Sequence, residues 1–154
     1  MSVKPIPDGY HSVTPYLYIK GASEAIAWYQ KAFGATEMMR LNMPESDIIM
    51  HAEIKIGNSI VMLTEENPDW GAISPSTLGG IATSFMIYVE DVDSAYKQAI
   101  DAGATVVRDI ADQFYGDRSG CLSDPYGHQW TIATHVEDLS EEEMMARFNA
   151  QMQR

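Results

Sequence analysis

The sequence predicts an α+β protein that consists of two βαβββ modules and a C-terminal helix. The first observation is a repeated order of elements, because a strand, a helix and three further strands follow one another twice along the chain. The second is a repeated helix end, since AFGATEMM closes the first helix and DAGATVV closes the second. Two unrelated strand–helix units are the alternative, and the similar lengths of the halves favour duplication.

The first module is predicted from side chains that alternate in character along the strands and from residues typical of turns and helix ends. Residues 13–19 alternate in a pattern typical of a strand, and its proline indicates an edge position. A helix is predicted over 21–34, where apolar residues recur at helical spacing before a glycine. Three strands are predicted over 36–43, 48–56 and 59–64, with the last two joined across Gly57-Asn58.

The second module repeats this order after a linker. Residues 65–83 are rich in Pro, Gly and Ser and lack periodicity, so they are predicted to connect the modules. A strand over 84–89, a helix over 92–102, a strand over 105–109 and a hairpin within 115–134 follow. One domain is therefore expected over 1–154, with module 1 at about 10–64, module 2 at about 84–137 and a C-terminal helix at about 140–152. Ser140 and Glu143 form a capping box for that helix.

The hairpin at the end of module 2 predicts which side chains share a face. Its turn reads Asp124-Pro125-Tyr126-Gly127, a favourable turn sequence. If Ser123 lies opposite His128, Arg118 belongs to the same face as Gln129 and Thr131. Gly120 and Leu122 would join that face, which is predicted to line a cavity. Cys121 would then point towards the helices as a buried thiol.

Composition excludes several classes of partner. The formal net charge of −12 argues against binding to nucleic acid or to anionic membranes. The single cysteine excludes an intrachain disulfide and is typical of a reducing compartment. No apolar run of about eighteen residues and no apolar signal core are present, so a cytoplasmic protein without membrane contact is expected.

The hairpin letters also resemble a known family. GDRSG followed by DPYGHQW is similar to the last two strands of the vicinal oxygen chelate superfamily, which holds glyoxalase I, extradiol dioxygenases and the bleomycin and fosfomycin resistance proteins. Within it, TPYL, HAEIKIG and GDRSG…DPYGH look most like the PhnB-like branch, and the resemblance covers roughly residues 10–137. It implies an incomplete eight-stranded barrel-like sheet with the helices outside and a ligand cavity between the modules.

The same resemblance implies four metal-ligand positions, and the chain departs from the family at all of them. They fall at Thr14, Met62, Ser84 and Thr131. Hydroxyl and thioether groups are poor ligands for the divalent ions of this family, so no metal and no cofactor are expected. His51 and Glu53 share the face of Met62 by hairpin register, but two ligands are fewer than a zinc or iron site needs.

A metal-independent small-molecule-binding protein is therefore the first functional hypothesis. The expected ligand contacts are Thr14, Tyr16, Tyr18, His51, Glu53, Met62, Ser84, Tyr88, Arg118, Gln129 and Thr131. Arg118 would pair either with Glu53 or with a carboxylate or phosphonate of the ligand. His51 and Glu53 would form either a polar pocket wall or an exposed rim.

The second hypothesis is a lyase, isomerase or dioxygenase-like enzyme. It would act without metal, with His51 as base and Arg118 steadying negative charge, or through displaced metal ligands around His51 and Glu53. Those three residues are the catalytic candidates. A homodimer is expected in either case, because the chain has an edge-type first strand and a Met-rich tail, and symmetric dimers are common.

Overall fold

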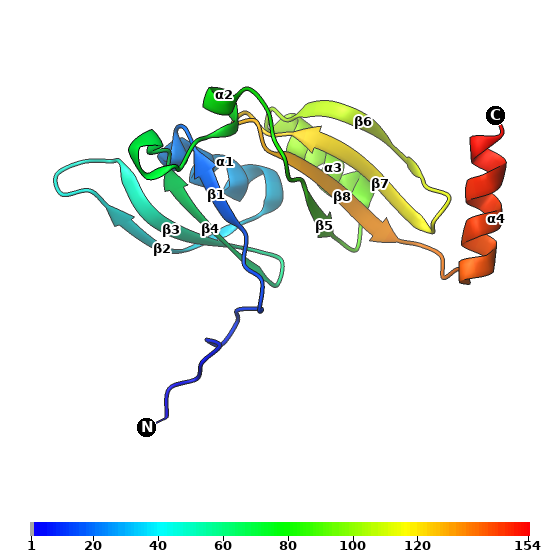
Figure 1. Ribbon diagram of the computed structural model, residues 1–154, viewed down its shortest axis with the longest axis horizontal. Helices are drawn as coiled ribbons and strands as arrows, with labels where there is room; N and C mark the ends of the chain where they lie inside the picture. The colour runs from blue at the N-terminus through cyan, green and yellow to red at the C-terminus, as the bar shows by residue number, and fades with distance from the viewer. Residues whose placement is uncertain (1) are drawn as a thin grey trace. The chain divides into compact units, whose positions relative to one another are not determined.

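The computed structural model describes residues 2–154 and contains two four-stranded sheets (Figure 1). The first compact unit comprises residues up to 82 together with 125–128, and the second comprises 83–124 and 129–154. Each unit has the predicted order of one strand, one helix and three strands. The duplicated α+β class is therefore confirmed, as two separate sheets and without a closed barrel.

The first unit is a mixed sheet with one helix on one face. Its strand order is β1-β4-β3-β2, in which β1 and β4 run parallel and the other pairs are antiparallel. The helix contacts β1, β2, β3 and β4. The elements are β1 (Tyr16–Ile19), α1 (Ala22–Phe33), β2 (Thr36–Asn42), β3 (Ile49–Ile56) and β4 (Ser59–Glu65).

The second unit repeats this topology with the order β5-β8-β7-β6, and β5 is parallel to β8. Its helix, α3, contacts β6, β7 and β8. The elements are β5 (Phe85–Tyr88), α3 (Val92–Asp101), β6 (Thr105–Asp112), β7 (Asp117–Ser123), β8 (Gln129–His135) and α4 (Glu141–Met152).

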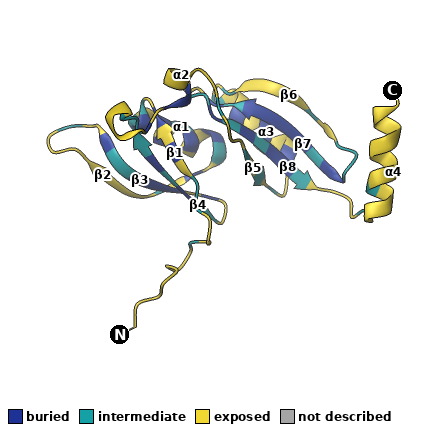
Figure 2. Ribbon diagram, viewed as in Figure 1, coloured by how far each residue is buried: buried dark blue, intermediate teal, exposed yellow. Residues whose placement is uncertain are grey.

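The first core forms because strand side chains alternate between two faces. Leu17 and Ile19 of β1 are fully buried, as are Ile26 and Tyr29 of α1, the helix that contacts this sheet. Figure 2 shows buried segments in both the helix and the strands. Burial of such side chains stabilises a fold by roughly 1.5–3 kcal/mol each. The alternate residues of β1 remain exposed, so the opposite sheet face is open. Below, this face is called the open face of the first sheet.

The linker between the modules contains more structure than its composition predicts. A 3-10 turn, η1 (Pro68–Trp70), and a short helix, α2 (Pro75–Leu78), interrupt it. Ser74 caps α2 and is fully buried. The Glu66 carboxylate accepts hydrogen bonds from the Ser74 backbone and the Thr77 hydroxyl, which organises a segment that lacks apolar periodicity. The segment predicted to connect the modules therefore contains a 3-10 turn and a short helix.

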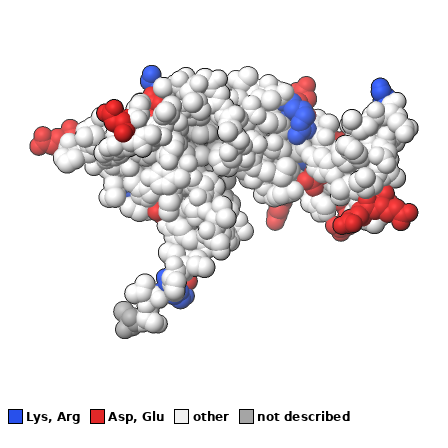
Figure 3. Space-filling model, in the orientation of Figure 1, with Lys and Arg blue, Asp and Glu red and all other residues white. Residues whose placement is uncertain are grey.

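Helix α4 begins at the predicted capping box. The Ser140 hydroxyl accepts from the Glu143 backbone, and the Glu143 carboxylate accepts from the Ser140 backbone. No residue of α4 is buried, and Phe148 contacts the ring of Phe114. Its first turn carries three glutamates, which gather as an acidic patch at the start of the helix (Figure 3). None of the helices described has the length and apolar character needed to cross a membrane.

Candidate functional site

The open face of the first sheet carries the most developed polar arrangement. Strand pairing places Tyr16, Met62 and Glu53 side by side across β1, β4 and β3. Tyr16 is 43% exposed, whereas Glu53 is only 7% exposed. Tyr18 is 40% exposed, and the centroids of the Tyr16 and Tyr18 rings lie 6.0 Å apart. A nearly buried carboxylate thus lies beside solvent-facing aromatic rings.

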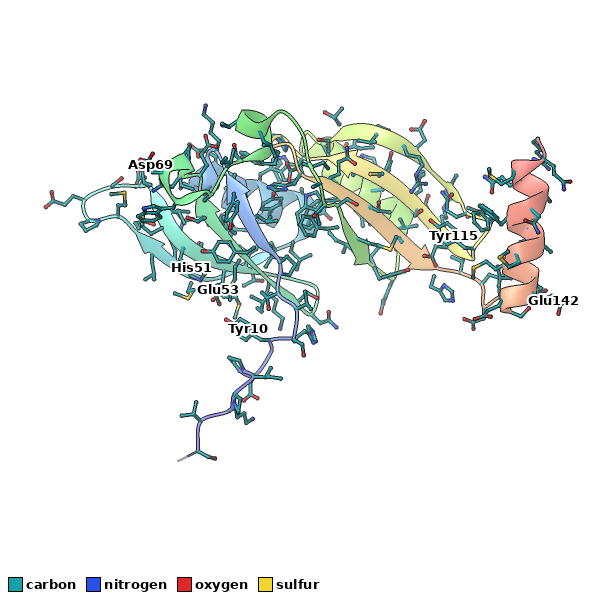
Figure 4. The ribbon with its side chains drawn as sticks, in the orientation of Figure 1. Tyr10, His51, Glu53, Asp69, Tyr115 and Glu142 are labelled. Carbon is teal, nitrogen blue, oxygen red and sulfur yellow. The ribbon has the colours of Figure 1, made fainter. Side chains whose placement is uncertain are left out.

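Hydrogen bonds connect four side chains at this face in series, and the series is called here the Tyr10–Tyr16 chain. Figure 4 labels three of its members, Tyr10, His51 and Glu53. The Tyr10 hydroxyl donates to Glu53 Oε2, and Glu53 Oε1 lies 3.2 Å from His51 Nε2. His51 Nδ1 lies 2.8 Å from the Tyr16 hydroxyl. Because a carboxylate only accepts, Nε2 of neutral His51 carries the proton and Nδ1 accepts from Tyr16. Glu53 therefore fixes the tautomer and the orientation of the imidazole.

Both tyrosines of the Tyr10–Tyr16 chain, Tyr10 and Tyr16, act as hydrogen-bond donors. The pKa of Tyr10 is raised above its usual value, chiefly because its hydroxyl donates to Glu53. Burial raises the pKa of Tyr16, and the neighbouring Tyr18 and Glu53 add to the effect. A raised pKa disfavours the phenolate, so neither hydroxyl is prepared to act as a nucleophile. The arrangement is suited to orienting a bound polar group.

The structure brings together most of the site residues predicted on the first sheet. His51, Glu53 and Met62 share its open face, as the Gly57-Asn58 turn predicts, because Glu53 pairs with Met62 and Lys55 with Ile60. Thr14 precedes β1, which is shorter than predicted, and its hydroxyl contacts the His11 carbonyl. Tyr10, which sequence reasoning missed, belongs to the same site.

The second sheet also has an open face, opposite α3. Tyr88 on β5 and Thr131 on β8 lie there, and Gln129 has the same alternation as Thr131. Ser84 lies just before β5 and is exposed. Tyr88 is 60% exposed, and its hydroxyl donates to Asp117 at 2.8 Å. These residues remain predicted ligand contacts.

The predicted position of Arg118 is wrong. Ser123 pairs with Gln129 rather than with His128, so Arg118 pairs with Thr134 on the α3 side of the sheet. There its guanidinium donates to Asp93 of α3 at 2.8 and 3.0 Å and to Asp112 at 3.2 Å. These carboxylates raise its pKa further. Arg118 therefore does not line the open face, and it does not pair with Glu53.

The same one-residue difference reverses the other side chains of β7. Gly120 and Leu122 face α3, whereas Ser119 and Cys121 belong to the open face. Cys121 is buried as expected, but on the opposite side of the sheet from the one predicted.

A second polar cluster lies at the end of β8, and sequence reasoning missed its centre. Asp117 is 4% exposed and accepts from Tyr88 and from His135 Nδ1, the latter at 2.8 Å. His135 Nε2 lies 2.8 Å from Asp138. Both ring nitrogens therefore face carboxylates, which raise the His135 pKa above its ordinary value. The two-residue period that links Asp117 to Ser119 would have placed it on the open face if the hairpin register had been right.

This cluster predicts a pH-dependent contribution to stability. The imidazolium of His135 is favoured by Asp117 on β7 and by Asp138 after β8, so its pKa is higher in the folded chain than in the unfolded chain. The stabilisation is fully present below about pH 6.5 and is lost as the pH rises through the raised pKa. His135→Gln should therefore reduce the free energy of unfolding more at about pH 5.5 than at about pH 8.5, as measured by urea denaturation.

The exposed His11 supplies the matched control. His11→Gln should change the free energy of unfolding by less than about 0.5 kcal/mol, as is usual for substitutions at exposed positions. An effect of His135→Gln that is equal at both pH values would contradict the imidazolium assignment.

The metal that the family resemblance implies does not fit the side chains present. Thr14, Met62, Ser84 and Thr131 offer hydroxyl and thioether groups, which are poor ligands for zinc or iron. His51 and Glu53 are hydrogen-bonded to each other. Within residues 2–154, no group of three or more His, Cys, Asp and Glu side chains is arranged to hold a metal ion.

Comparison with known proteins agrees with this fold. Residues 10–132 match the model of the Glyoxalase/Bleomycin resistance protein/Dioxygenase superfamily. The chain is 36% identical over 143 residues to the uncharacterized protein Mb0911c of Mycobacterium bovis, covering 91% of this chain and 93% of the relative.

Solved structures share the architecture at lower identity. TioX from Micromonospora sp. ML1 aligns with a TM-score of 0.64 and 24% identity, over 84% of this chain and 100% of its own. The PhnB protein from Bacillus cereus, described as a putative 3-demethylubiquinone-9 3-methyltransferase, aligns with a TM-score of 0.60 and 15% identity, over 80% of this chain and 99% of its own. With the family match spanning most of its length and both sheets in the expected order, the chain belongs to the Glyoxalase/Bleomycin resistance protein/Dioxygenase superfamily.

Proposed function

We propose that the protein binds a small organic molecule, without a metal, on the open face of the first sheet. The observation that carries this proposal is the Tyr10–Tyr16 chain, in which Glu53 is nearly buried on the sheet face opposite α1. Binding sites commonly combine apolar walls with a few oriented polar groups. Tyr16, Tyr18 and Met62 supply the walls, while Glu53 and His51 supply the orientation.

The experiment is a thermal-shift screen of metabolites and drug-like compounds, run with and without chelator. A compound that binds only the folded chain raises the melting temperature by mass action. We expect hits that survive chelation and that bind about tenfold more weakly to Glu53→Gln, because a charge-assisted hydrogen bond is lost. Arg118→Ala is the control, since this residue lies on the α3 side of the other sheet and should leave binding unchanged. A screen without hits, or equal binding to Glu53→Gln, would contradict the proposal.

An enzymatic function is the second candidate, and one observation favours it. Glu53 holds His51 with Nδ1 directed at the Tyr16 hydroxyl, an arrangement that could position a general base for a lyase or isomerase reaction. Because the pKa of Tyr16 is raised, His51 rather than Tyr16 would exchange the proton. Turnover of a screening hit, abolished by His51→Gln while binding persists, would establish this alternative.

The proposal also covers the branch of the superfamily, the cellular compartment and the oligomeric state of the protein. Membership of the PhnB-like branch is supported by TPYL, HAEIKIG and GDRSG and by the fold shared with the PhnB protein. The cytoplasmic location stays a prediction.

The predicted homodimer would use the exposed apolar side chains of α4, namely Met145, Phe148 and Met152. Light scattering should then give twice the chain mass of 17.1 kDa.

A further inference from the structure

The N-terminal segment reaches the candidate site through one side chain. Residues 2–9 are exposed, and Tyr10 is half-buried where its hydroxyl donates to Glu53. Among the described residues, this is the side-chain hydrogen bond that ties residues 2–14 to the sheet. The remaining side-chain bonds within the segment are local, such as that from Lys4 to Asp8. The phenol of Tyr10, which follows the exposed residues 2–9, is therefore hydrogen-bonded to Oε2 of the Glu53 carboxylate.

The surroundings of Glu53 suit an aromatic ring. Met62 pairs with Glu53 on one side and Met39 on the other, so two thioethers flank the carboxylate on the open face. Sulfur atoms make favourable contacts with aromatic rings. Tyr16 extends this surface beyond Met62. The Glu53 carboxylate therefore has apolar cross-strand neighbours on both sides, and His51 contacts its other oxygen, Oε1.

We infer that this site takes phenolic molecules, an aromatic ring that carries a hydroxyl group, and that Tyr10 is a built-in competitor for the same oxygen of Glu53. This inference rests on the proposed binding function. The ligand hydroxyl replaces that of Tyr10 on Glu53 Oε2, while Oε1 keeps His51 in place. The ligand ring lies against Met39 and Met62.

The tether of Tyr10 determines how strongly it competes. A tethered group acts at a high effective concentration, on the order of millimolar for a short flexible link, so it opposes a weak free phenol. Phenylalanine at position 10 keeps the ring and removes the donor. Tyr10→Phe should therefore leave Glu53 Oε2 open and increase the affinity for a phenol by about tenfold.

The test uses p-cresol, which has the shape of a tyrosine side chain, with toluene as the matched compound that lacks the hydroxyl. Titration calorimetry or NMR should show p-cresol binding about tenfold more tightly to Tyr10→Phe than to the unsubstituted chain. Toluene should not distinguish the two proteins. Adding Glu53→Gln to Tyr10→Phe should remove the gain, because the charged acceptor is lost.

The outcomes separate this inference from the function on which it rests. Equal p-cresol affinity of the unsubstituted protein and Tyr10→Phe would overturn the inference that Tyr10 competes with the ligand. An equal gain in affinity for toluene would overturn it as well, and both results would leave small-molecule binding intact. Absence of binding by p-cresol and by every compound of the thermal-shift screen would instead remove the proposed function. If Tyr10→Phe does not fold, the Tyr10 ring resonance of the unsubstituted chain gives the answer, since p-cresol should shift it and toluene should not.

Discussion

Gly120→Val is expected to reduce the free energy of unfolding by about 3 kcal/mol, because no space exists for its side chain. A Cβ atom at Gly120 would lie 2.4 Å from Tyr96 Cε2 and 3.1 Å from the Ile110 nitrogen. Tyr96 is 6% exposed, and its hydroxyl donates to the Arg108 carbonyl, so the ring cannot turn aside freely. The substitution would push α3 away from β7. Urea denaturation followed by circular dichroism measures the loss.

Gly80 provides the matched control. A Cβ atom there would meet no heavy atom within 4 Å. Gly80→Val should therefore change the free energy of unfolding by less than about 0.5 kcal/mol, as is usual for surface substitutions. Similar losses at the two positions would show that β-branching in the chain, and not the contact with Tyr96, determines the cost.

Asp124→Ala is expected to cost about 2 kcal/mol, because it leaves a buried donor without its acceptor. Trp130 Nε1 donates to Asp124 Oδ2 at 2.8 Å, and the exposed fractions of the two residues are 2% and 5%. Asp124→Asn keeps a carbonyl oxygen at the same place and should cost clearly less. Denaturation of both variants, followed by tryptophan fluorescence, tests the difference. Equal losses would assign the role of Asp124 to its charge or to the turn backbone.

This hydrogen bond also explains where sequence reasoning failed. The turn was predicted to close with Ser123 opposite His128, which leaves four residues between the strands. In the structure, Asp124 turns inward to Trp130, and His128 is 8% exposed with Nε2 3.2 Å from the Tyr18 carbonyl. His128 is therefore outside the ladder, and pairing begins at Gln129. A shift of one residue moves every side chain of a strand to the other face, and Arg118 moved with it.

The first hairpin was predictable for the opposite reason. Gly57-Asn58 is a two-residue turn, whose geometry fixes the register without help from tertiary contacts. His51, Glu53 and Met62 were therefore placed on one face from sequence alone. The repeated AFGATEMM and DAGATVV endings likewise identified the two modules, because periodicity and stop signals are local properties.

Tyr10 could not be found in this way. It precedes Glu53 by 43 positions and belongs to a segment without periodicity, so no local pattern connects the two residues. The bond between Asp117 and His135 spans 18 positions and became visible only once the strands were paired. Contacts that join distant parts of a chain depend on the whole fold, whereas strands and turns depend mainly on their neighbours.

The first unit consists of two chain segments that are far apart in sequence, which affects the order in which its parts are synthesised. Residues 125–128 are counted with that unit, where the ring of Tyr126 lies 6.4 Å from that of Tyr29 and His128 bonds to Tyr18. These residues are synthesised more than forty positions after the rest of the unit ends at residue 82. A nascent chain emerging from the ribosome can thus complete the first sheet, which ends at residue 65, while the unit still lacks residues 125–128. Tyr29 and the Tyr18 carbonyl receive their final neighbours only late in elongation.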